Sequence, residues 1–333
     1  MKHLATLFVA LASLASCRTS EEERIEEQTL AWHREFALRL LDDGQLANAL
    51  NQVNLGLEID SDDERLLLIK SRIHLQRGSA ADVNAAEELL REFAGDDNFI
   101  ACVGLGEALE RQGVLRWESA REIESGKRAT TAADPARRAL DLRDEAQARW
   151  SESTQWYESA LKIKPDYIQA INGLQRVWAL RGDLARSLAA SERLLALADK
   201  EVEFWRAELA RPEIKAEYEA ELRRRIQASA KLLTETHMSA STALVALGRS
   251  ADAMAHLDAS VQLEPSRAEI YSRRAQLHLA AGRAREASED LRQFLKLSTL
   301  PIEAPDMVRA FDLLAQCEVA LEAASSTNSP ATR

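Results

Sequence analysis

The feature that most constrains this fold is a layout of two short helices around a glycine turn, repeated along most of the chain. The clearest copy covers 268–299, where Tyr271 and Ala275 share one face of a first helix and Gly282 follows it. A second helix begins its inner face at Ala287. Glycine suits the turn because it accepts a positive φ without the clash that a side chain makes. Such a chain is expected to form stacked helix pairs.

The same layout recurs in five other segments, which cover 30–60, 64–95, 97–163, 166–199 and 234–265. A small residue in most first helices lets the paired helices approach closely: Ala37, Ser71, Gly106, Ser241 and Ala275. Small residues also recur in the second helices: Ala49, Ala253 and Ala287. Proline closes two of the copies, at Pro165 and Pro265, and Gln175 departs from the pattern because it stands where a small residue is usual.

This pattern resembles the tetratricopeptide repeat, a helix–turn–helix unit of about 34 residues. The resemblance covers 30–300 and implies an all-α fold, a tetratricopeptide-repeat α-solenoid of about six repeats, which is a superhelix of antiparallel helix pairs. A low content of glycine (12) and proline (7) in 333 residues agrees with an all-helical chain. The alternative is a helical bundle without repeats.

Two of the predicted helical hairpins are longer than the repeat requires. In the third copy, apolar residues at helical spacing continue over 105–123 and again over 142–161. Asp134 and Pro135, between these stripes, are typical of the start of a helix. The sequence therefore predicts an elongated helical hairpin, in which the third repeat is extended at 113–150.

A second extension is predicted at 198–233, where apolar stripes on both sides of Arg211 and Pro212 form another long hairpin. After the last repeat, 304–324 is expected to form a C-terminal capping helix, and 325–333 a flexible tail. The capping helix is expected to cover the end of the repeat array with an inward face made of Val308, Phe311, Leu314 and Leu321.

The N-terminus carries a separate signal. Lys2 and His3 precede an uncharged apolar run over 4–14. A helix that spans a bilayer needs about 20 apolar residues, so this run is too short for one. Its length is typical of the apolar part of a secretory signal peptide.

The run ends in Leu14, Ala15, Ser16 and Cys17, which resemble the lipobox of bacterial lipoproteins. The resemblance implies that 1–16 is a lipoprotein signal peptide and that 17–29 is a lipidated cysteine and tether, with an acylated Cys17 as the new N-terminus. It also implies a lipid-anchored location in the cell envelope, at the outer membrane on the periplasmic side. An ordinary signal peptide with a chance cysteine is the alternative.

Composition and motifs exclude several classes of function. The formal net charge is −11, and nucleic-acid partners are not expected because phosphate binding needs positive surfaces. Cys102 and Cys317 are expected to be small buried hydrophobic residues, not a disulfide framework. The sequence has no phosphate-binding glycine loop, no histidine pair at metal-binding spacing and no nucleophile elbow. We therefore expect no catalytic residues, metal, cofactor or small-molecule substrate.

The family resemblance implies that the first helices line a concave groove that holds a peptide or a partner helix. Eight residues are candidates for this groove: Arg34, Leu38, Arg72, Asn172, Arg176, Thr242, Arg273 and Gln276. The predicted function is a non-catalytic interaction scaffold or adaptor of the bacterial cell envelope, tethered to the membrane through Cys17, with envelope proteins or peptides as partners. The alternatives are a periplasmic holdase or carrier for exported chains, and a cell-envelope hydrolase, for which no segment remains to form a catalytic domain.

Overall fold

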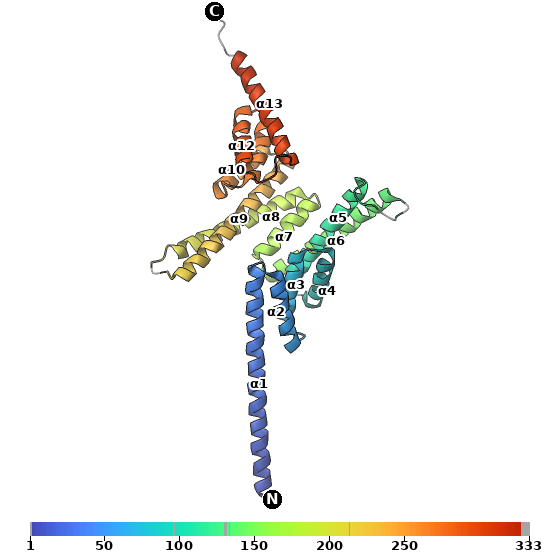
Figure 1. Ribbon diagram of the computed structural model, residues 1–333, viewed down its shortest axis with the longest axis vertical. Helices are drawn as coiled ribbons and strands as arrows, with labels where there is room; N and C mark the ends of the chain where they lie inside the picture. Colours follow the sequence, from blue (N-terminus) through green and yellow to red (C-terminus); the bar gives the residue numbers. More distant parts are fainter. Residues whose placement is uncertain (1, 96, 130–131, 133, 213, 328–333) are drawn as a thin grey trace, which may run out of the picture. The chain divides into compact units, whose positions relative to one another are not determined.

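The computed structural model describes residues 2–95, 97–129, 132, 134–212 and 214–327, with no side chains for 2–20, 22 and 324–327. These residues form thirteen α-helices and no strand (Figure 1). Contacts divide the chain into two compact units, residues 1–173 and 174–333. Within the described residues, no helix has the combination of length and apolar character that crossing a bilayer requires.

The first unit is built of antiparallel helix pairs. The pairs are α1 (Lys2–Asp42) with α2 (Leu46–Ile59), α3 (Glu64–Arg77) with α4 (Ala80–Phe93), and α5 (Phe99–Glu124) with α6 (Pro135–Ile163). Successive pairs also touch, since α2 packs on α3 and α4 packs on α5. We call the first helix of each pair the A helix and the second the B helix.

The second unit continues the same architecture after α7 (Ile168–Leu180), which spans the boundary between the units. Its helices are α8 (Leu184–Leu209), α9 (Ala216–Ala246), α10 (Ser250–Leu263), α11 (Ala268–Ala280), α12 (Ala284–Leu297) and α13 (Pro305–Thr327). Each packs on the next in chain order. The A helices here are α7, α9 and α11, and their B helices are α8, α10 and α12. The all-α fold expected from the repeats is thus confirmed, as stacked helix pairs of tetratricopeptide type within each unit.

In every pair the A helix is followed by a glycine whose backbone lies in the left-handed region. The six turn glycines have φ between 71° and 78°: Gly44, Gly78, Gly126, Gly182, Gly248 and Gly282. At Gly282 the reversal is closed by backbone bonds, since the amide of Arg283 donates to the carbonyl of His278 over 2.9 Å. In the third pair the helix runs through Gly113, and the turn glycine is Gly126.

The third pair is held together by two large rings that lie against glycine. A Cβ atom on Gly113 would lie 2.3 Å from Nε1 of Trp150, and one on Gly106 would lie 2.9 Å from the ring of Tyr157. Both rings donate to Glu110: Trp150 Nε1 to its carbonyl over 3.2 Å, and Tyr157 Oη to its carboxylate over 2.9 Å. The absence of a side chain on these glycines therefore lets α5 and α6 approach closely.

The helix start predicted at Asp134 is confirmed, and an aromatic contact joins the two helices of this hairpin. The side chain of Asp134 caps α6 by accepting from the amide of Arg137 over 3.0 Å. The rings of Trp117 and Trp150 pair across the hairpin with centroids 5.5 Å apart. In the second long hairpin, which the B helix α8 forms with the next A helix α9, the ring of Trp205 lies against Phe204 and the guanidinium of Arg225, and Tyr218 is exposed.

The inward face predicted for the C-terminal helix is wrong in part. Val308 is 47% exposed and Phe311 is 43% exposed. The residues of α13 buried in the cluster with α12 are instead Met307, Ala310 and Cys317. Both sets have helical spacing, so the sequence pattern alone could not decide which one faces the neighbouring helix.

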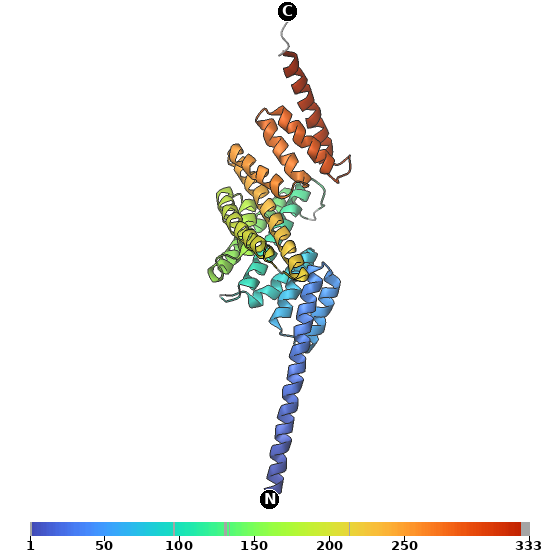
Figure 2. The same cartoon turned by 90° about the vertical axis from the view of Figure 1, so that its left-hand side faces the viewer.

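The N-terminal helix α1 runs without a break from Lys2 to Asp42 (Figure 2). The backbone therefore shows no boundary at residue 30, where the sequence placed the end of the tether and the start of the first repeat. Residues 328–333 of the predicted tail lie outside the described residues. Cys102 and Cys317 are both buried, as expected.

Gly113→Ala is expected to lower the free energy of unfolding by about 1–3 kcal/mol, because the new methyl group would overlap the buried ring of Trp150. Urea unfolding followed by circular dichroism measures this. Gly95→Ala is the matched control, since the nearest atom to a Cβ there is 3.8 Å away. Equal stability of the two variants would contradict the close packing of α5 on α6.

Candidate interaction surface

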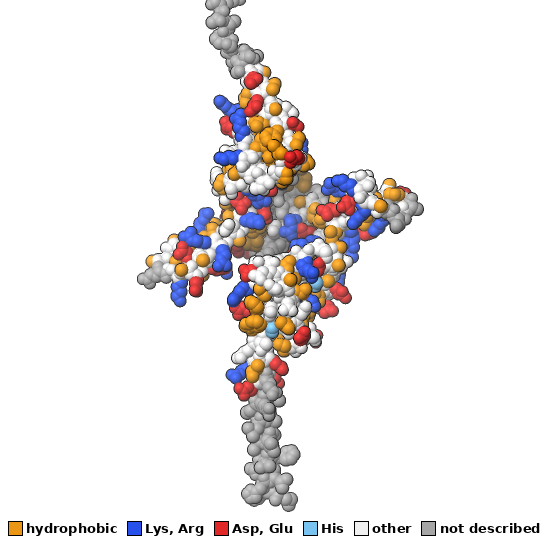
Figure 3. Space-filling model, viewed as in Figure 1, with side chains coloured by type: hydrophobic (Ala, Val, Ile, Leu, Met, Phe, Trp, Pro, Cys, Tyr) orange, Lys and Arg blue, Asp and Glu red, His pale blue; other side chains and the backbone are white. Residues whose placement is uncertain are grey.

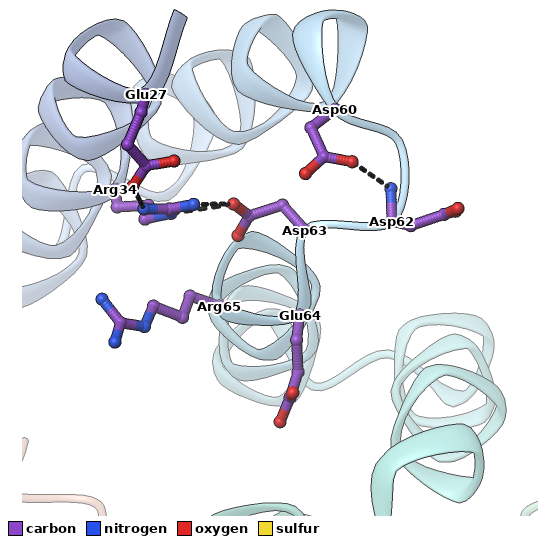
Figure 4. Close-up of a pocket in the computed structure, with 7 residues that line it drawn as sticks. All are labelled: Glu27, Arg34, Asp60, Asp62, Asp63, Glu64 and Arg65. Carbon is purple, nitrogen blue, oxygen red and sulfur yellow. Dashed lines mark hydrogen bonds and ion pairs between the residues drawn. The ribbon is translucent and has the colours of Figure 1, made fainter. Parts of the chain in front are cut away.

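Arg34, the first groove candidate, is held by carboxylates of its own chain (Figure 4). Its Nε donates to Asp63 Oδ2 over 2.8 Å, and its Nη1 donates to Glu27 Oε1 over 2.8 Å. The Asp63 side chain is only 2% exposed, and its other oxygen caps α3 by accepting from the amide of Leu66. Arg34 therefore joins α1 to the start of α3, and this contact ties the first helix pair to the second.

The environment of Asp63 keeps it ionised. Burial raises the pKa of its carboxyl, but the hydrogen bonds from Arg34 and from the Leu66 amide outweigh burial, so the pKa is lowered from its ordinary value. The hydrogen bonds that Arg34 makes to Asp63 and to Glu27 raise the pKa of its guanidinium group. The pair is therefore charged throughout the neutral pH range.

This ion pair lies at the edge of an open hollow of about 400 Å³. Its lining has five carboxylates and two guanidinium groups: Glu27, Asp60, Asp62, Asp63, Glu64, Arg34 and Arg65. The excess of negative charge favours cationic groups over anionic ones in this hollow.

The other candidates of the first unit are placed differently. Leu38 and Arg72 are exposed, and Asn172 is half-buried. Burial raises the pKa of the Tyr167 hydroxyl, and the positive charge of Arg72 opposes this rise. The ring of Tyr167 also meets Phe99 edge to face, with centroids 4.9 Å apart.

In the second unit the structure brings two candidates together. Arg273 Nη1 donates to Thr242 Oγ1 over 2.9 Å and to the carbonyl of Met238 over 3.3 Å. This contact joins the A helices α9 and α11 on one surface. Gln276 is exposed on the same helix as Arg273, and Arg176 is half-buried on α7. The side chains of Leu14, Ala15, Ser16 and Cys17 lie outside the described residues.

A buried ion pair on α11 and α12 was missed by the sequence reasoning. Arg274 Nη2 donates to Asp290 Oδ1 over 2.6 Å, and Asp290 is only 3% exposed. Arg274 Nη1 also donates to Asp258 over 2.9 Å. The signal in the sequence was an arginine in an A helix and an aspartate 16 residues later in its B helix, which close packing of the pair brings together.

No group of three or more histidine, cysteine, aspartate or glutamate side chains in the described part of the chain could hold a metal ion. Two histidines, His237 and His256, do lie together, with their Nδ1 atoms 2.8 Å apart. Burial, with a smaller contribution from His256, lowers the pKa of His237 to about 4. His237 is therefore neutral at pH 7, and the two rings share one hydrogen bond between α9 and α10.

No family model matches the chain, and no curated protein matches it in sequence. Solved structures match in fold. The human IFIT1 dimer with m7Gppp-AAAA is 15% identical with a TM-score of 0.52, over 87% of this chain and 54% of the IFIT1 chain. Acl4, the assembly chaperone of RpL4, is 17% identical with a TM-score of 0.51, over 78% and 87% of the two chains.

A thermophilic tetratricopeptide protein of Thermus thermophilus is also similar, with 17% identity and a TM-score of 0.48 over 76% of this chain and 99% of that one. This chain spans about half the length of the IFIT1 protein. At such low identities, the similarity shows only a common fold.

Asp63→Asn is expected to reduce the free energy of unfolding at pH 7 by about 1–3 kcal/mol, since it removes the charge that Arg34 needs. Because the native pKa of Asp63 is lowered, its stabilising effect is full above the unfolded pKa of about 3.9 and is lost as the pH falls through the native value.

Urea unfolding of both proteins from pH 7 to pH 3 measures this difference, which should shrink below about pH 4. Asp62→Asn, at an exposed position of the same loop, is the control. A difference that stays constant down to pH 3 would contradict the assigned role of the Asp63 charge.

Proposed function

We propose that this chain is a non-catalytic scaffold that binds other proteins and is tethered to a membrane of the bacterial cell envelope through an acylated Cys17. The protein-binding part of this proposal rests on the polar residues that the A helices expose. Arg72, Thr242, Arg273 and Gln276 are exposed on helices that are otherwise fixed by buried contacts. Rigid helices with polar exposed faces are suited to bind a peptide or a helix.

The solved structures of similar fold supply a parallel for this role. Acl4 is an assembly chaperone of another protein, RpL4. IFIT1 was solved with m7Gppp-AAAA, but a formal net charge of −11 makes a nucleic-acid partner unfavourable for this chain. A protein partner is therefore the better proposal.

The envelope part of the proposal rests on the N-terminal sequence. Lys2, an apolar run and the four residues Leu14, Ala15, Ser16 and Cys17 occur together at one end of the chain. Lipid chains on Cys17 would anchor the protein, since each buried CH₂ group contributes about 0.8 kcal/mol. Among the residues whose side chains the structure describes, Leu30 is the first buried one, and it follows Cys17 by 13 helical residues, which is about 20 Å along α1. With α1 standing away from the surface, an acylated Cys17 would hold the packed part of the first pair, which begins at Leu30, clear of the lipid.

Cys17→Ser is expected to abolish incorporation of a labelled fatty acid and to move the protein from the membrane fraction to the soluble fraction, because serine lacks the thiol that is acylated. Metabolic labelling and fractionation of the bacterial host measure both effects. Cys102→Ser, at a buried position, is the matched control and should keep the label. Label retained in Cys17→Ser would contradict the proposed anchor.

In-cell crosslinking followed by affinity purification and mass spectrometry tests the scaffold itself. We expect one dominant envelope protein, captured less efficiently with Cys17→Ser. A diffuse set of exported chains, captured equally with both forms, would contradict an adaptor and favour a holdase for exported proteins. Turnover of cell-wall or protein substrates by the purified chain would contradict the non-catalytic assignment.

A further inference from the structure

Two aromatic rings of the first unit position the side chain of a lysine. Phe99 begins α5, and Tyr167 lies in the loop between α6 and α7. Their rings meet edge to face, with centroids 4.9 Å apart. The ammonium group of Lys164 lies over both rings, 5.0 Å from the centroid of each. Because the face of an aromatic ring attracts a cation, the two rings fix the place of this charge.

The backbone that carries Lys164 and Tyr167 is ordered by its own hydrogen bonds. The amide of Lys164 donates to the carbonyl of Ala160 over 2.9 Å, at the end of α6. The amide of Tyr167 donates to the Lys164 carbonyl over 3.2 Å, which closes a turn. The carbonyl of Tyr167 accepts from the amide of Ala170 over 3.1 Å, in the first turn of α7. Both side chains therefore leave a turn that needs no ligand to order it.

The hydroxyl group of Tyr167 has no hydrogen-bond partner among the residues that the structure describes. Two other tyrosines are bonded, since Tyr157 Oη donates to Glu110 over 2.9 Å and Tyr271 Oη donates to the Pro265 carbonyl over 2.8 Å. Tyr167 is half-buried, and burial raises the pKa of its hydroxyl, which therefore stays protonated at neutral pH. A tyrosine hydroxyl that leaves water usually finds an acceptor. This one is free to donate to an acceptor from another molecule.

A second cation lies near this hydroxyl. The guanidinium of Arg72, which is exposed on α3, is the charge that acts on Tyr167, and α3 contacts α5. Figure 3 shows basic and acidic side chains interspersed on both long hairpins. In contrast, no carboxylate in the described part of the chain pairs with Arg72 or Lys164. We call Arg72, Phe99, Lys164 and Tyr167 the Tyr167 cluster.

The carboxylates of the same segments do not neutralise the two cations. Glu64, at the start of α3, accepts from Asn98 Nδ2 over 2.6 Å. Asp166 precedes Tyr167 in the loop, and it is engaged with another group of the chain. Asp97 is exposed and makes no ion pair within the described residues. The Tyr167 cluster therefore presents three hydrogen-bond donors, and no carboxylate accepts from any of them.

A carboxylate is the group that matches these donors. Its two oxygens accept from a guanidinium, an ammonium or a hydroxyl group, and hydrogen bonds between charged groups are the strong ones. The two rings offer apolar contact to the methylene groups that carry the carboxylate. A nucleic acid brings a negative charge with every nucleotide, and the formal net charge of −11 opposes its approach.

We propose that the Tyr167 cluster binds a glutamate or aspartate side chain in an exposed segment of a partner protein. The carboxylate would accept from Arg72, Lys164 and the Tyr167 hydroxyl, and its carbon chain would lie against the rings. This inference rests on the proposed scaffold function, since it names the chemistry of one partner segment. It does not depend on Cys17.

A short fluorescent peptide of alternating glutamate and serine is the probe, and fluorescence anisotropy with the purified full chain measures its binding. The same peptide with glutamine in place of glutamate should bind about tenfold more weakly or worse, because it lacks the charge that the cations attract. Lys164→Gln should weaken binding of the glutamate peptide by a similar factor. Tyr167→Phe keeps the ring and removes only the hydroxyl, and it should weaken binding about fivefold.

Lys162→Gln is the matched control for Lys164→Gln. Lys162 is exposed on the same helix, and the substitution removes the same charge. It should leave the affinity within about twofold, because salt at physiological strength screens charges beyond about 8 Å. Circular dichroism should show the same helix content in all three variants, since each replaces a side chain that is exposed or half-buried.

Four results would overturn the proposal. They are equal affinity for the glutamate and glutamine peptides, equal effects of Lys164→Gln and Lys162→Gln, unchanged affinity in Tyr167→Phe, and tighter binding of a single-stranded oligonucleotide than of the glutamate peptide. Displacement of the peptide by millimolar phosphate would assign the cluster to a small anion and also overturn it. The assay uses purified chain, so its failure contradicts the cluster alone, whereas absence of a partner in the cell contradicts the scaffold proposal.

Discussion

Close packing of large side chains against residues with little or no side chain is the interaction on which the described structure depends. Tyr157 lies against Gly106 of its own pair and against Gly173, where a Cβ atom would come within 2.2 Å of the ring. One ring therefore fixes both the pairing of α5 with α6 and the position of the start of α7. Glycine inside a helix is destabilising by about 1 kcal/mol relative to alanine, so burial of the rings has to offset that loss.

The turns follow from the same packing. All six A-to-B reversals use glycine at positive φ, which lets the B helix fold back directly onto the A helix. In the third pair, Gly113 contacts the Trp150 ring inside the hairpin and the reversal occurs at Gly126, which makes the pair long. Arg34 with Asp63 and Arg274 with Asp290 add buried charge pairs between neighbouring helices. Breaking such a pair on one side leaves a buried charge without its partner.

The turns, the helix caps and the close contacts between paired helices were predictable from the sequence because each depends on a local or repeated motif. The turn glycines, the cap at Asp134 and the small residues at repeat spacing each follow from a short motif. The groove candidate Arg34 was less predictable, since the buried Asp63 that holds it lies 29 residues away. The inward face predicted for α13 was wrong in part, because Phe311 and Met307 belong to two apolar stripes of equal spacing. Only packing on α12 separates them, and that packing leaves Val308 and Phe311 exposed.

The central claim is that exposed faces of the A helices bind proteins. A photo-reactive amino acid placed at Gln276, exposed on the A helix α11, tests it most directly in the native host. The same residue at Arg285, exposed on the B helix α12, is the comparison. The account predicts a discrete crosslinked partner from position 276 and none from position 285. Equal crosslinking from both positions, or none from position 276, would contradict it.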